Sequence, residues 1–353
     1  MDITKIDRNF ASAAVPREGT RRLFLPCEPF RLYGGFYEDG IGFVRMPQKD
    51  ASAVSEGVYA LADNGAGLRL NFRTDSKMLR IIAEESAFRR MRHMALTGST
   101  GFVLSSREGP ERKSVFRGVL CPQWDAGDVF EDAVNLDGTM RDYVLHFPLY
   151  SGVKFLAVEI DENARIEAGA GYKPEKPILY YGSSITQGGC ASRADMSYED
   201  MICEQTGVDY INLGFSGSGR AEDAMVDYLR RIDCSIFVCD YDHNAPTPEY
   251  LEKTHERLYR RYREARPDTP VVFVTRPVAC TSEDTDRRYA IIRKTYETAK
   301  EEGDKNVYFV DGRTFFPENL RYRCQVDGCH PTDLGFYYMA EKIGGVIEKI
   351  LKK

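Results

Sequence analysis

A short stretch rich in glycine and serine carries the residue types best suited to chemistry. Residues 180–189 read Tyr-Tyr-Gly-Ser-Ser-Ile-Thr-Gln-Gly-Gly; an apolar, β-prone segment precedes them, and helical spacing begins near Tyr198. A serine on such a strand-to-helix turn has an accessible hydroxyl, and the free N–H groups of the helix start favour developing negative charge. Because the same N–H groups bind phosphates, the turn by itself fits a nucleophile, a phosphate site or a purely structural connection.

A histidine near the C-terminus is the second candidate for chemistry. Asp327 and His330 stand three residues apart in a loop that leads into a helix with an apolar stripe, whose packing fixes the start of that helix. In this arrangement the carboxylate can accept a hydrogen bond from Nδ1–H and leave Nε2 free as a base. A lone histidine is more often structural, so the pair alone does not decide the function.

Two further loops offer hydrogen-bond donors. Residues 212–220 contain Gly217 among several glycines, which allow backbone N–H groups to turn toward a ligand, although a flexible connection fits equally well. Asn244 follows another β-prone segment and can aim its side-chain amide at a neighbouring loop. Asparagine shortly before proline is also common turn chemistry.

All of these loops belong to a regular alternation of strand and helix patterns that begins after Pro177. The predicted strands are 178–181, 209–213, 235–239, 271–275 and 307–310, and the predicted helices are 197–205, 221–231, 248–264, 284–302 and 332–351. Five successive βα units predict a parallel sheet covered by helices on both faces. Sites in such sheets lie beyond the carboxyl ends of the strands, which directs attention to the loops that follow them.

The first half of the chain has a different pattern. Short β-prone segments, such as 68–73, 101–104, 143–147 and 154–160, are separated by turn residues with almost no convincing helix, which favours a β-sandwich of the jelly-roll type. A chain of 353 residues fits two domains. We expect a β-sandwich at 1–165, a linker with glycine and proline at 166–176, and an α/β domain at 177–353.

Charge and hydropathy exclude several classes of partner. The net charge is −6 and no dense Lys/Arg run occurs, which argues against nucleic acid and anionic membranes as partners. The first seven residues lack the apolar region of a secretory signal, and no run approaches the length of a membrane span.

The cysteines point to a reducing compartment and away from a metal site. Nine of them are scattered without paired spacing, which predicts reduced thiols in a cytoplasmic protein. Cys324 and Cys329 stand near His330, but no second Cys/His pair lies at ligand spacing, so we expect no metal there.

Taken together, the four loops resemble the sequence blocks of SGNH (GDSL-type) hydrolases. The blocks occur in order as Gly182-Ser183-Ser184 with Ile185, Gly217, Asn244, and Asp327-x-x-His330. Residues 182–193 (GSSITQGGCASR), 212–219 (NLGFSGSG) and 94–104 resemble a bacterial subgroup with an N-terminal β-sandwich. The resemblance implies a flavodoxin-like α/β domain with a five-stranded parallel sheet, preceded by that sandwich.

The resemblance also implies roles for individual residues. Ser184 would be the nucleophile, His330 its base and Asp327 the group that orients the imidazole. An oxyanion hole would come from the N–H groups of Ser184 and Gly217 and the side-chain amide of Asn244, without a metal or cofactor.

Two departures from the family pattern affect this assignment. Ser183 stands where the family usually has aspartate, which leaves the nucleophile in place but changes how its loop is held. The third block reads Asp-His-Asn-Ala instead of Gly-x-Asn-Asp, so Asn244 rests on one matched residue and on its position after the third strand.

The resemblance is also the guide to substrate. Relatives with a sandwich ahead of the SGNH domain are often esterases that remove acetyl groups from sugars and plant polysaccharides, which implies a small-molecule or oligosaccharide ester as substrate. The absence of an amphipathic lid or membrane-binding helix agrees with a small acyl group. Trp124, the sole tryptophan, can stack on a sugar ring, but a core or domain-interface position is favoured.

Two rival functions fit parts of the pattern. A lysophospholipase or thioesterase would act on longer acyl chains, and a non-catalytic protein could bind sugar or phosphate with the same loops. The phosphate alternative lacks a lysine in the first loop and leaves Asp327 and His330 unexplained. The sugar, the acetylated position and any association into homo-oligomers stay open at this level.

Overall fold

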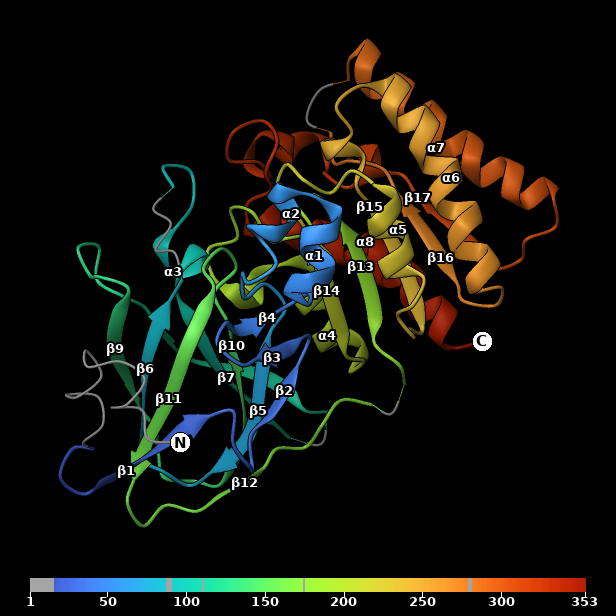
Figure 1. The fold of residues 1–353 in the computed structure, drawn as a ribbon. Coiled ribbons are helices and arrows are strands. Elements are labelled where there is room, and N and C mark those ends of the chain that lie inside the picture. The colour runs from blue at the N-terminus through green and yellow to red at the C-terminus, as the bar shows by residue number, and fades with distance from the viewer. Residues whose placement is uncertain (1–15, 87–90, 110, 174, 279–280) are drawn as a thin grey trace.

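A computed structural model describes residues 16–353 except 87–90, 110, 174 and 279–280. A β-sandwich built from the first half of the chain lies beside an α/β unit built from the second half (Figure 1). The predicted order of the two folds is therefore confirmed, while the prediction about the first seven residues lies outside the described part of the chain.

Two antiparallel sheets face each other in the sandwich. One has the order β3-β4-β11-β6-β9 with β1 on β11, and the other has the order β12-β5-β10-β7-β8 with β2 on β5. Their bounds are β1 Thr20–Leu25, β2 Arg31–Tyr33, β3 Phe36–Glu38, β4 Gly42–Val44, β5 Arg69–Thr74, β6 Met78–Glu85, β7 Phe102–Glu108, β8 Lys113–Leu120, β9 Val129–Asn135, β10 Arg141–His146, β11 Val153–Asp161 and β12 Ile166–Ala168. Apolar side chains at alternate positions, such as Leu70 and Phe72 or Leu79 and Ile81, fill the space between the sheets.

The sandwich reaches slightly further along the chain than its predicted end at residue 165. Strand β12 pairs antiparallel with β5 through Ile166, Glu167 and Ala168, which lie in the predicted linker. The chain then crosses to the first strand of the second unit.

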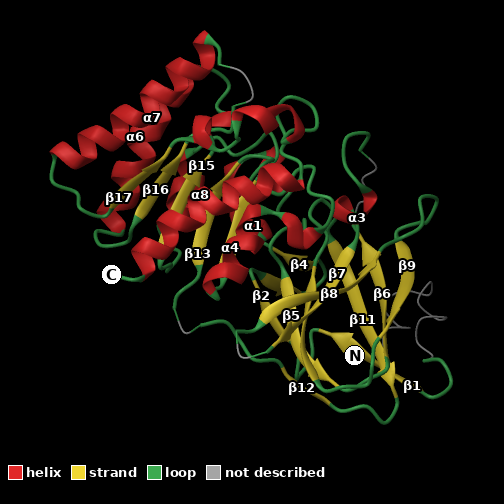
Figure 2. Cartoon of the chain, turned by 180° about the vertical axis from the view of Figure 1, so that it is seen from behind, coloured by secondary structure: helices red, strands yellow, loops and turns green. Residues whose placement is uncertain are grey.

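A five-stranded parallel sheet with the order β14-β13-β15-β16-β17 forms the centre of the α/β unit (Figure 2). Its strands are β13 Ile178–Gly182, β14 Tyr210–Gly214, β15 Ile236–Asp240, β16 Val271–Val274 and β17 Val307–Val310. The helices between and after them are α4 Tyr198–Thr206, α5 Asp223–Leu229, α6 Pro248–Ala265, α7 Glu283–Glu301 and α8 Asp333–Leu351. Short 3₁₀ turns lie at η3 Ala194–Met196, η4 Asp242–Asn244, η5 Gly312–Thr314 and η6 Glu318–Arg323. Every predicted strand and helix of this half is present within a few residues.

Alternation along the strands divides the core of this unit into two layers. Ile178 and Tyr180 of β13 join the apolar cluster that contains α4 and α8, whereas Leu179 and Tyr181 join the cluster that contains α5 and α6. Because both faces of the sheet are covered, both sets of side chains must be apolar, and the strands read as continuous apolar runs.

Three short helices in the first half were not predicted. They are α1 Gln48–Val54, α2 Glu56–Tyr59 and α3 Leu96–Ser99. Ala51 of α1 and Val58 of α2 are buried in the same cluster as α5, so these helices cover the α/β unit although they precede most of the sandwich in sequence. Helices of seven and four residues bury one or two side chains and show no apolar stripe, so periodicity cannot reveal them.

Two buried arginines join the sandwich to strand β14. Arg45 donates to the carbonyl oxygens of Asn212 at 3.1 Å and Gly214 at 2.8 Å, and its guanidinium lies over the ring of Phe215. Arg69 donates to the carbonyl oxygen of Tyr210 and to the carboxylate of the preceding Asp209, both at 2.8 Å. A buried charge left without partners is costly, so these contacts favour one orientation of the two units.

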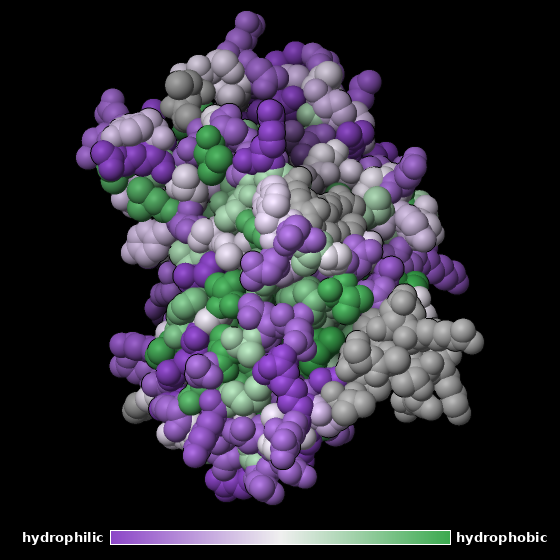
Figure 3. Space-filling model, turned by 90° about the vertical axis from the view of Figure 1, so that its left-hand side faces the viewer, coloured by the Kyte–Doolittle hydropathy of each residue, from purple (hydrophilic) through white to green (hydrophobic). Residues whose placement is uncertain are grey.

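Hydrophilic side chains cover much of the face shown in Figure 3, and hydrophobic ones gather across its middle. Within the described residues, no helix combines the length and apolar character needed to cross a membrane.

Candidate active site

Three polar side chains from two distant parts of the sequence meet at the carboxyl edge of the parallel sheet. Ser184 Oγ lies 2.8 Å from His330 Nε2, although 146 positions separate the two residues. His330 Nδ1 lies in turn 2.8 Å from Asp327 Oδ2. The arrangement is a hydrogen-bonded series that runs from hydroxyl to imidazole to carboxylate.

The environment of Asp327 determines which nitrogen of the neighbouring neutral imidazole carries the proton. Its Oδ1 accepts the backbone N–H groups of His330 at 2.8 Å and Cys329 at 3.1 Å. Burial raises the pKa of Asp327, but hydrogen bonds from the backbone and ring of His330 outweigh it and bring that pKa to about 2. The carboxylate is thus ionised near neutral pH and can only accept, so Nδ1 of neutral His330 carries the proton and Nε2 is free to accept from Ser184.

The loop that carries Ser184 is held by its own side chains. Ser183 Oγ accepts the N–H of Ile185 at 3.1 Å, so the serine that departs from the family pattern stabilises the turn directly. A Cβ on Gly182 would come within 2.0 Å of Thr186 Oγ1 and 2.4 Å of the Asp240 carbonyl oxygen, so no larger residue fits at the end of β13.

Residues of the sandwich that no sequence pattern indicates also hold this loop. Gln187 Nε2 donates to Asn64 Oδ1 at 3.0 Å and to the Leu149 carbonyl at 3.2 Å. The hydroxyl of Tyr150 donates to the Ser184 carbonyl at 3.1 Å. Asn64 and Tyr150 stand in no recognisable motif, so only the docking of the two units reveals their part in the site.

The proposed oxyanion-hole donors come from loops after neighbouring strands. Gly182 at the end of β13 is in register with Gly214 of β14 and Asp240 of β15, so the loops that follow all leave the sheet at one edge. Gly217 has φ +69°, a left-handed conformation that favours glycine. In the described part of the chain, neither the Ser184 N–H nor the Gly217 N–H has a protein acceptor.

The third predicted donor, Asn244, is already oriented by the neighbouring loop. Its Nδ2 donates to the Phe215 carbonyl at 2.7 Å. A side-chain amide has two N–H groups, so this bond fixes the plane of the amide and leaves one donor for a ligand.

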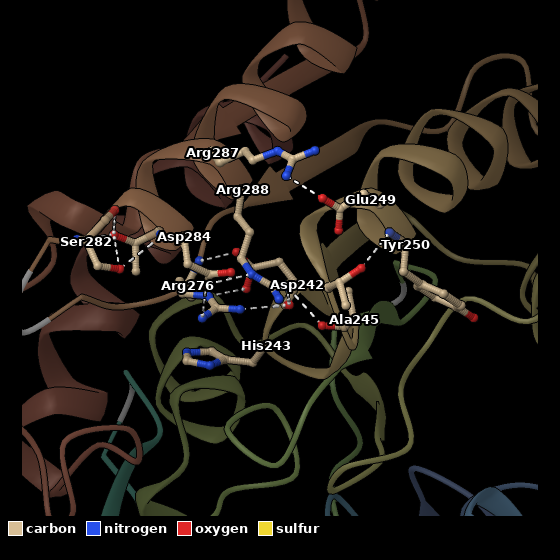
Figure 4. A network of polar contacts seen from close by, with 12 residues as sticks. Asp242, His243, Ala245, Glu249, Tyr250, Arg276, Ser282, Asp284, Arg287 and Arg288 are labelled. Carbon is tan, nitrogen blue, oxygen red and sulfur yellow. Dashed lines mark hydrogen bonds and ion pairs between the residues drawn. The ribbon is translucent and has the colours of Figure 1, made fainter.

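A network of charged residues supports the turn that carries Asn244 (Figure 4). Arg288 Nη1 from α7 donates to the carbonyl oxygens of Asp242 at 2.8 Å and Ala245 at 2.9 Å. Arg276 Nη2 donates to the Asp242 carbonyl at 2.9 Å, and the Arg276 N–H donates to the Asp242 carboxylate at 3.3 Å. Burial raises the pKa of Asp242, and the Arg276 charge opposes that rise. These residues, which sequence patterns did not single out, hold both ends of the η4 turn.

The expected core or interface position of Trp124 is wrong. Its side chain is 63% exposed in the loop between β8 and β9. That expectation rested on residue type alone, and whether a large side chain is covered depends on neighbours that the local sequence does not contain.

One group of side chains near the serine has the types and spacing of metal ligands. Potential ligand atoms of His93, Cys190 and His330 all lie within 4.8 Å of one another. Of the two cysteines discussed from the sequence, Cys324 is buried in the apolar core and Cys329 Sγ lies 3.8 Å from His243 Nδ1.

Two sequence families match the chain. Residues 175–348 match the GDSL-like lipase/acylhydrolase family, and residues 27–166 match the N-terminal domain of SGNH-hydrolase-type esterases. Comparison with curated proteins gave no match.

Solved structures resemble the chain over most of its length. A candidate GDSL-like lipase from Bacteroides ovatus ATCC 8483 is 28% identical, with 94% of this chain and 98% of that chain covered and a TM-score of 0.84. The salicylyl-acyltransferase SsfX3 of a tetracycline biosynthetic pathway is 18% identical, with coverages of 93% and 98% and a TM-score of 0.75. The acetyl xylan esterase Est2A from the rumen bacterium Butyrivibrio proteoclasticus is 12% identical, with coverages of 94% and 99% and a TM-score of 0.59.

The last two structures show the shared fold alone, whereas the two family matches cover most of both units. The resemblance to SGNH hydrolases seen in the sequence is confirmed. The chain therefore belongs to the GDSL-like lipase/acylhydrolase family and is a carboxylic ester hydrolase.

Proposed function

We propose that this esterase removes acetyl groups from O-acetylated carbohydrate, with Ser184 as nucleophile. The observation that carries the mechanism is the pair of 2.8 Å contacts that join Ser184 Oγ to His330 and His330 to Asp327. The acetyl and carbohydrate parts of the proposal draw on the acetyl xylan esterase among the similar structures.

The reaction proceeds in two halves. Ser184 Oγ attacks the ester carbonyl while His330 Nε2 takes its proton, and the C–O bond to the sugar breaks as His330 returns that proton to the leaving alkoxide. Water then attacks the acetyl-enzyme, His330 again takes and returns a proton, and acetate leaves. Asp327 stays ionised throughout and stabilises the imidazolium that forms in each half.

Negative charge that develops on the carbonyl oxygen requires nearby donors. The N–H groups of Ser184 and Gly217 and the second N–H of Asn244 are the groups we assign to it. All three belong to loops that leave one edge of the sheet, so they are oriented before substrate arrives and need little rearrangement.

The substitution of Ser184 tests the nucleophile. Ser184→Ala should abolish hydrolysis of p-nitrophenyl acetate, and a serine-directed acylating agent should label the wild type at Ser184 alone. Ser183→Ala is the comparison variant: it removes the hydroxyl that accepts the Ile185 N–H and so weakens the turn, but it keeps Ser184, so activity should fall far less than in Ser184→Ala. Full activity in Ser184→Ala, or labelling at another serine, would exclude the proposed nucleophile.

Substrate class is tested separately. A series of p-nitrophenyl esters from acetate to decanoate should show the highest kcat/KM for acetate, whereas a preference for long chains would favour a lysophospholipase or thioesterase. Acetate release from acetylated manno-, xylo- and cello-oligosaccharides, followed by NMR, would identify the sugar and the position. Sugar binding without acetate release would contradict the proposal and support a non-catalytic binding protein.

A further inference from the structure

Three side chains with affinity for soft metal ions converge beside the serine from three parts of the chain. His93 lies just before α3 in the sandwich half, Cys190 belongs to the loop that carries Ser184, and His330 follows β17 and η6. Their potential ligand atoms lie within 4.8 Å of one another, and the two imidazole rings are 5.6 Å apart between centroids. No part of the proposed esterase mechanism uses His93 or Cys190.

The thiol of Cys190 is held against the sandwich. Its side chain is buried, and Sγ donates to the backbone carbonyl of His93 at 3.3 Å. The residue has φ +73°, a left-handed conformation that costs a non-glycine residue about 1 kcal/mol or more. The fold therefore holds the Cys190 thiol beside His93 although the backbone conformation of Cys190 is unfavourable.

The catalytic histidine has the orientation that metal-bound histidines have in proteins. Its Nδ1 is bonded to the Asp327 carboxylate at 2.8 Å, so Nε2 is the atom available to accept a proton or a metal. Carboxylate–histidine–zinc groups use this same support to set the tautomer and to raise ligand basicity. His93 is exposed and can move toward the other two ligands.

We propose that His93, Cys190 and His330 form a binding site for a thiophilic divalent cation such as Zn²⁺, and that its occupation inhibits the esterase. Zinc bonds of about 2.3 Å to sulfur and about 2.0–2.1 Å to nitrogen place the ligand atoms of a tetrahedral site roughly 3.3–3.7 Å apart. The separations here, all within 4.8 Å, need a closing movement of about 1 Å by this geometry, which the exposed His93 side chain can supply. The Cys190 thiol loses its proton to water when the bond to the metal forms.

Inhibition follows because a metal and the serine compete for one atom. Ser184 Oγ is bonded to His330 Nε2 at 2.8 Å, and a cation on Nε2 removes the base that activates the hydroxyl. Because His93 belongs to the sandwich, a metal bound at this site would make a sandwich residue part of the inhibition of the α/β unit.

Binding can be measured without enzyme activity. Co²⁺ titrated into the reduced full-length protein should produce a near-ultraviolet thiolate-to-cobalt charge-transfer band. Ser184→Ala should keep the band, because the hydroxyl is not a proposed ligand, and Cys190→Ser should lose it. Cys329→Ser is the matched control, because its thiol lies next to His330 in sequence but faces His243. No band in the wild type, or an undiminished band in Cys190→Ser, would overturn the site.

Inhibition is measured on p-nitrophenyl acetate, each variant relative to its own metal-free rate. Zn²⁺ should inhibit the wild type reversibly, with activity restored by EDTA. His93→Phe keeps an aromatic ring at this exposed position but removes one ligand. Loss of a residue that only supports a metal ligand already weakens metal binding about 10–100-fold, so loss of the ligand itself should raise the inhibitory Zn²⁺ concentration at least about tenfold. Equal Zn²⁺ sensitivity in His93→Phe and wild type would overturn the proposal. Should the protein prove inactive on esters, the cobalt band would still decide the metal site.

Discussion

At the scale of single residues, the site depends on which hydrogen bonds each polar group can and cannot make. Ionised Asp327 has only acceptors, so the imidazole must present Nδ1–H to it and Nε2 to Ser184. Asn244 uses one amide hydrogen on the Phe215 carbonyl, and the position of the second follows from the plane that this bond sets. In both side chains, one hydrogen bond orients the group and so sets where its remaining donor or acceptor atom points.

Asp327→Asn tests this dependence. The asparagine amide can donate to Nδ1 and stabilise the wrong tautomer, so kcat on p-nitrophenyl acetate should fall by roughly 10³–10⁴ with little change in KM. Steady-state kinetics, with circular dichroism to confirm folding, measure the effect. A variant within tenfold of the wild type would show that the carboxylate does not orient His330.

Asn244→Ala tests the oxyanion assignment. Loss of one donor typically removes about 2.7–4 kcal/mol of transition-state stabilisation, so kcat should fall roughly 10²–10³-fold. Asn306→Ala serves as control, since that amide bonds the Asp268 carbonyl at the opposite edge of the sheet. Unchanged turnover in Asn244→Ala would remove this residue from the site.

At the level of secondary structure, the parallel strands place their following loops at one edge of the sheet, and neighbouring helices stabilise those loops. The loops after β13, β14 and β15 share one edge because these strands run in parallel and in register. The η4 turn after β15 has three residues, and Arg288 of α7 donates to the carbonyl oxygens at both of its ends. The position of Asn244 is thus determined by a helix that follows it by some forty residues.

Arg288→Ala should lower both stability and activity. The buried Ala245 carbonyl would lose its charged donor, at a cost of about 1–3 kcal/mol in the free energy of unfolding, whereas the Asp242 carbonyl would keep Arg276. The freed turn should also reduce kcat. Arg287→Ala is the control, because the exposed Arg287–Glu249 pair should contribute no more than about 1 kcal/mol. Urea unfolding and kinetics measure both effects, and equal losses in the two variants would contradict the role of Arg288.

At the scale of the whole molecule, burial of acidic groups connects the fold to pH. Glu85 at the end of β6 is fully buried, and within the described residues no hydrogen bond of normal geometry reaches its carboxyl oxygens, although the nearby Ser151 hydroxyl opposes the effect of burial on its pKa. Burial raises its pKa to about 9. Burial also raises the pKa of Glu199 and of Asp240 in the α/β unit well above the ordinary value. The native protein therefore holds protons that the unfolded chain releases at lower pH.

Glu85→Gln should become more stable than the wild type as pH rises. A raised native pKa gives stability that is complete below the unfolded pKa and is lost as pH increases toward the native one, here from about 4.5 to about 9. The difference in free energy of unfolding between variant and wild type should grow by up to about 1.4 kcal/mol per pH unit in this window. Urea unfolding at several pH values measures it.

The neighbouring residue supplies the control for that experiment. Glu84 lies closer to the surface, 3.5 Å from the Lys154 ammonium. Glu84→Gln should show a much smaller dependence on pH over the same range. Parallel curves for Glu85→Gln and wild type would show that Glu85 is ionised in the native protein.

Residue patterns alone predict the elements of the α/β unit and the order of its loops. Short apolar runs predicted the five strands that the structure describes in the α/β unit, and helical spacing predicted its five main helices, because both patterns arise from residues only a few positions apart. The motifs around Ser184, Gly217, Asn244 and His330 stand at the ends of those elements, so their common edge followed from the parallel sheet.

Contacts between distant segments of the chain could be seen only in the folded protein. The contact between Ser184 and His330, the support from Asn64 and Tyr150, the placement of α1 and the exposure of Trp124 all depend on packing between parts far apart in the chain. Local sequence patterns cannot predict these contacts, because the way the two units dock depends on the shape of their whole surfaces and on buried charges such as Arg45.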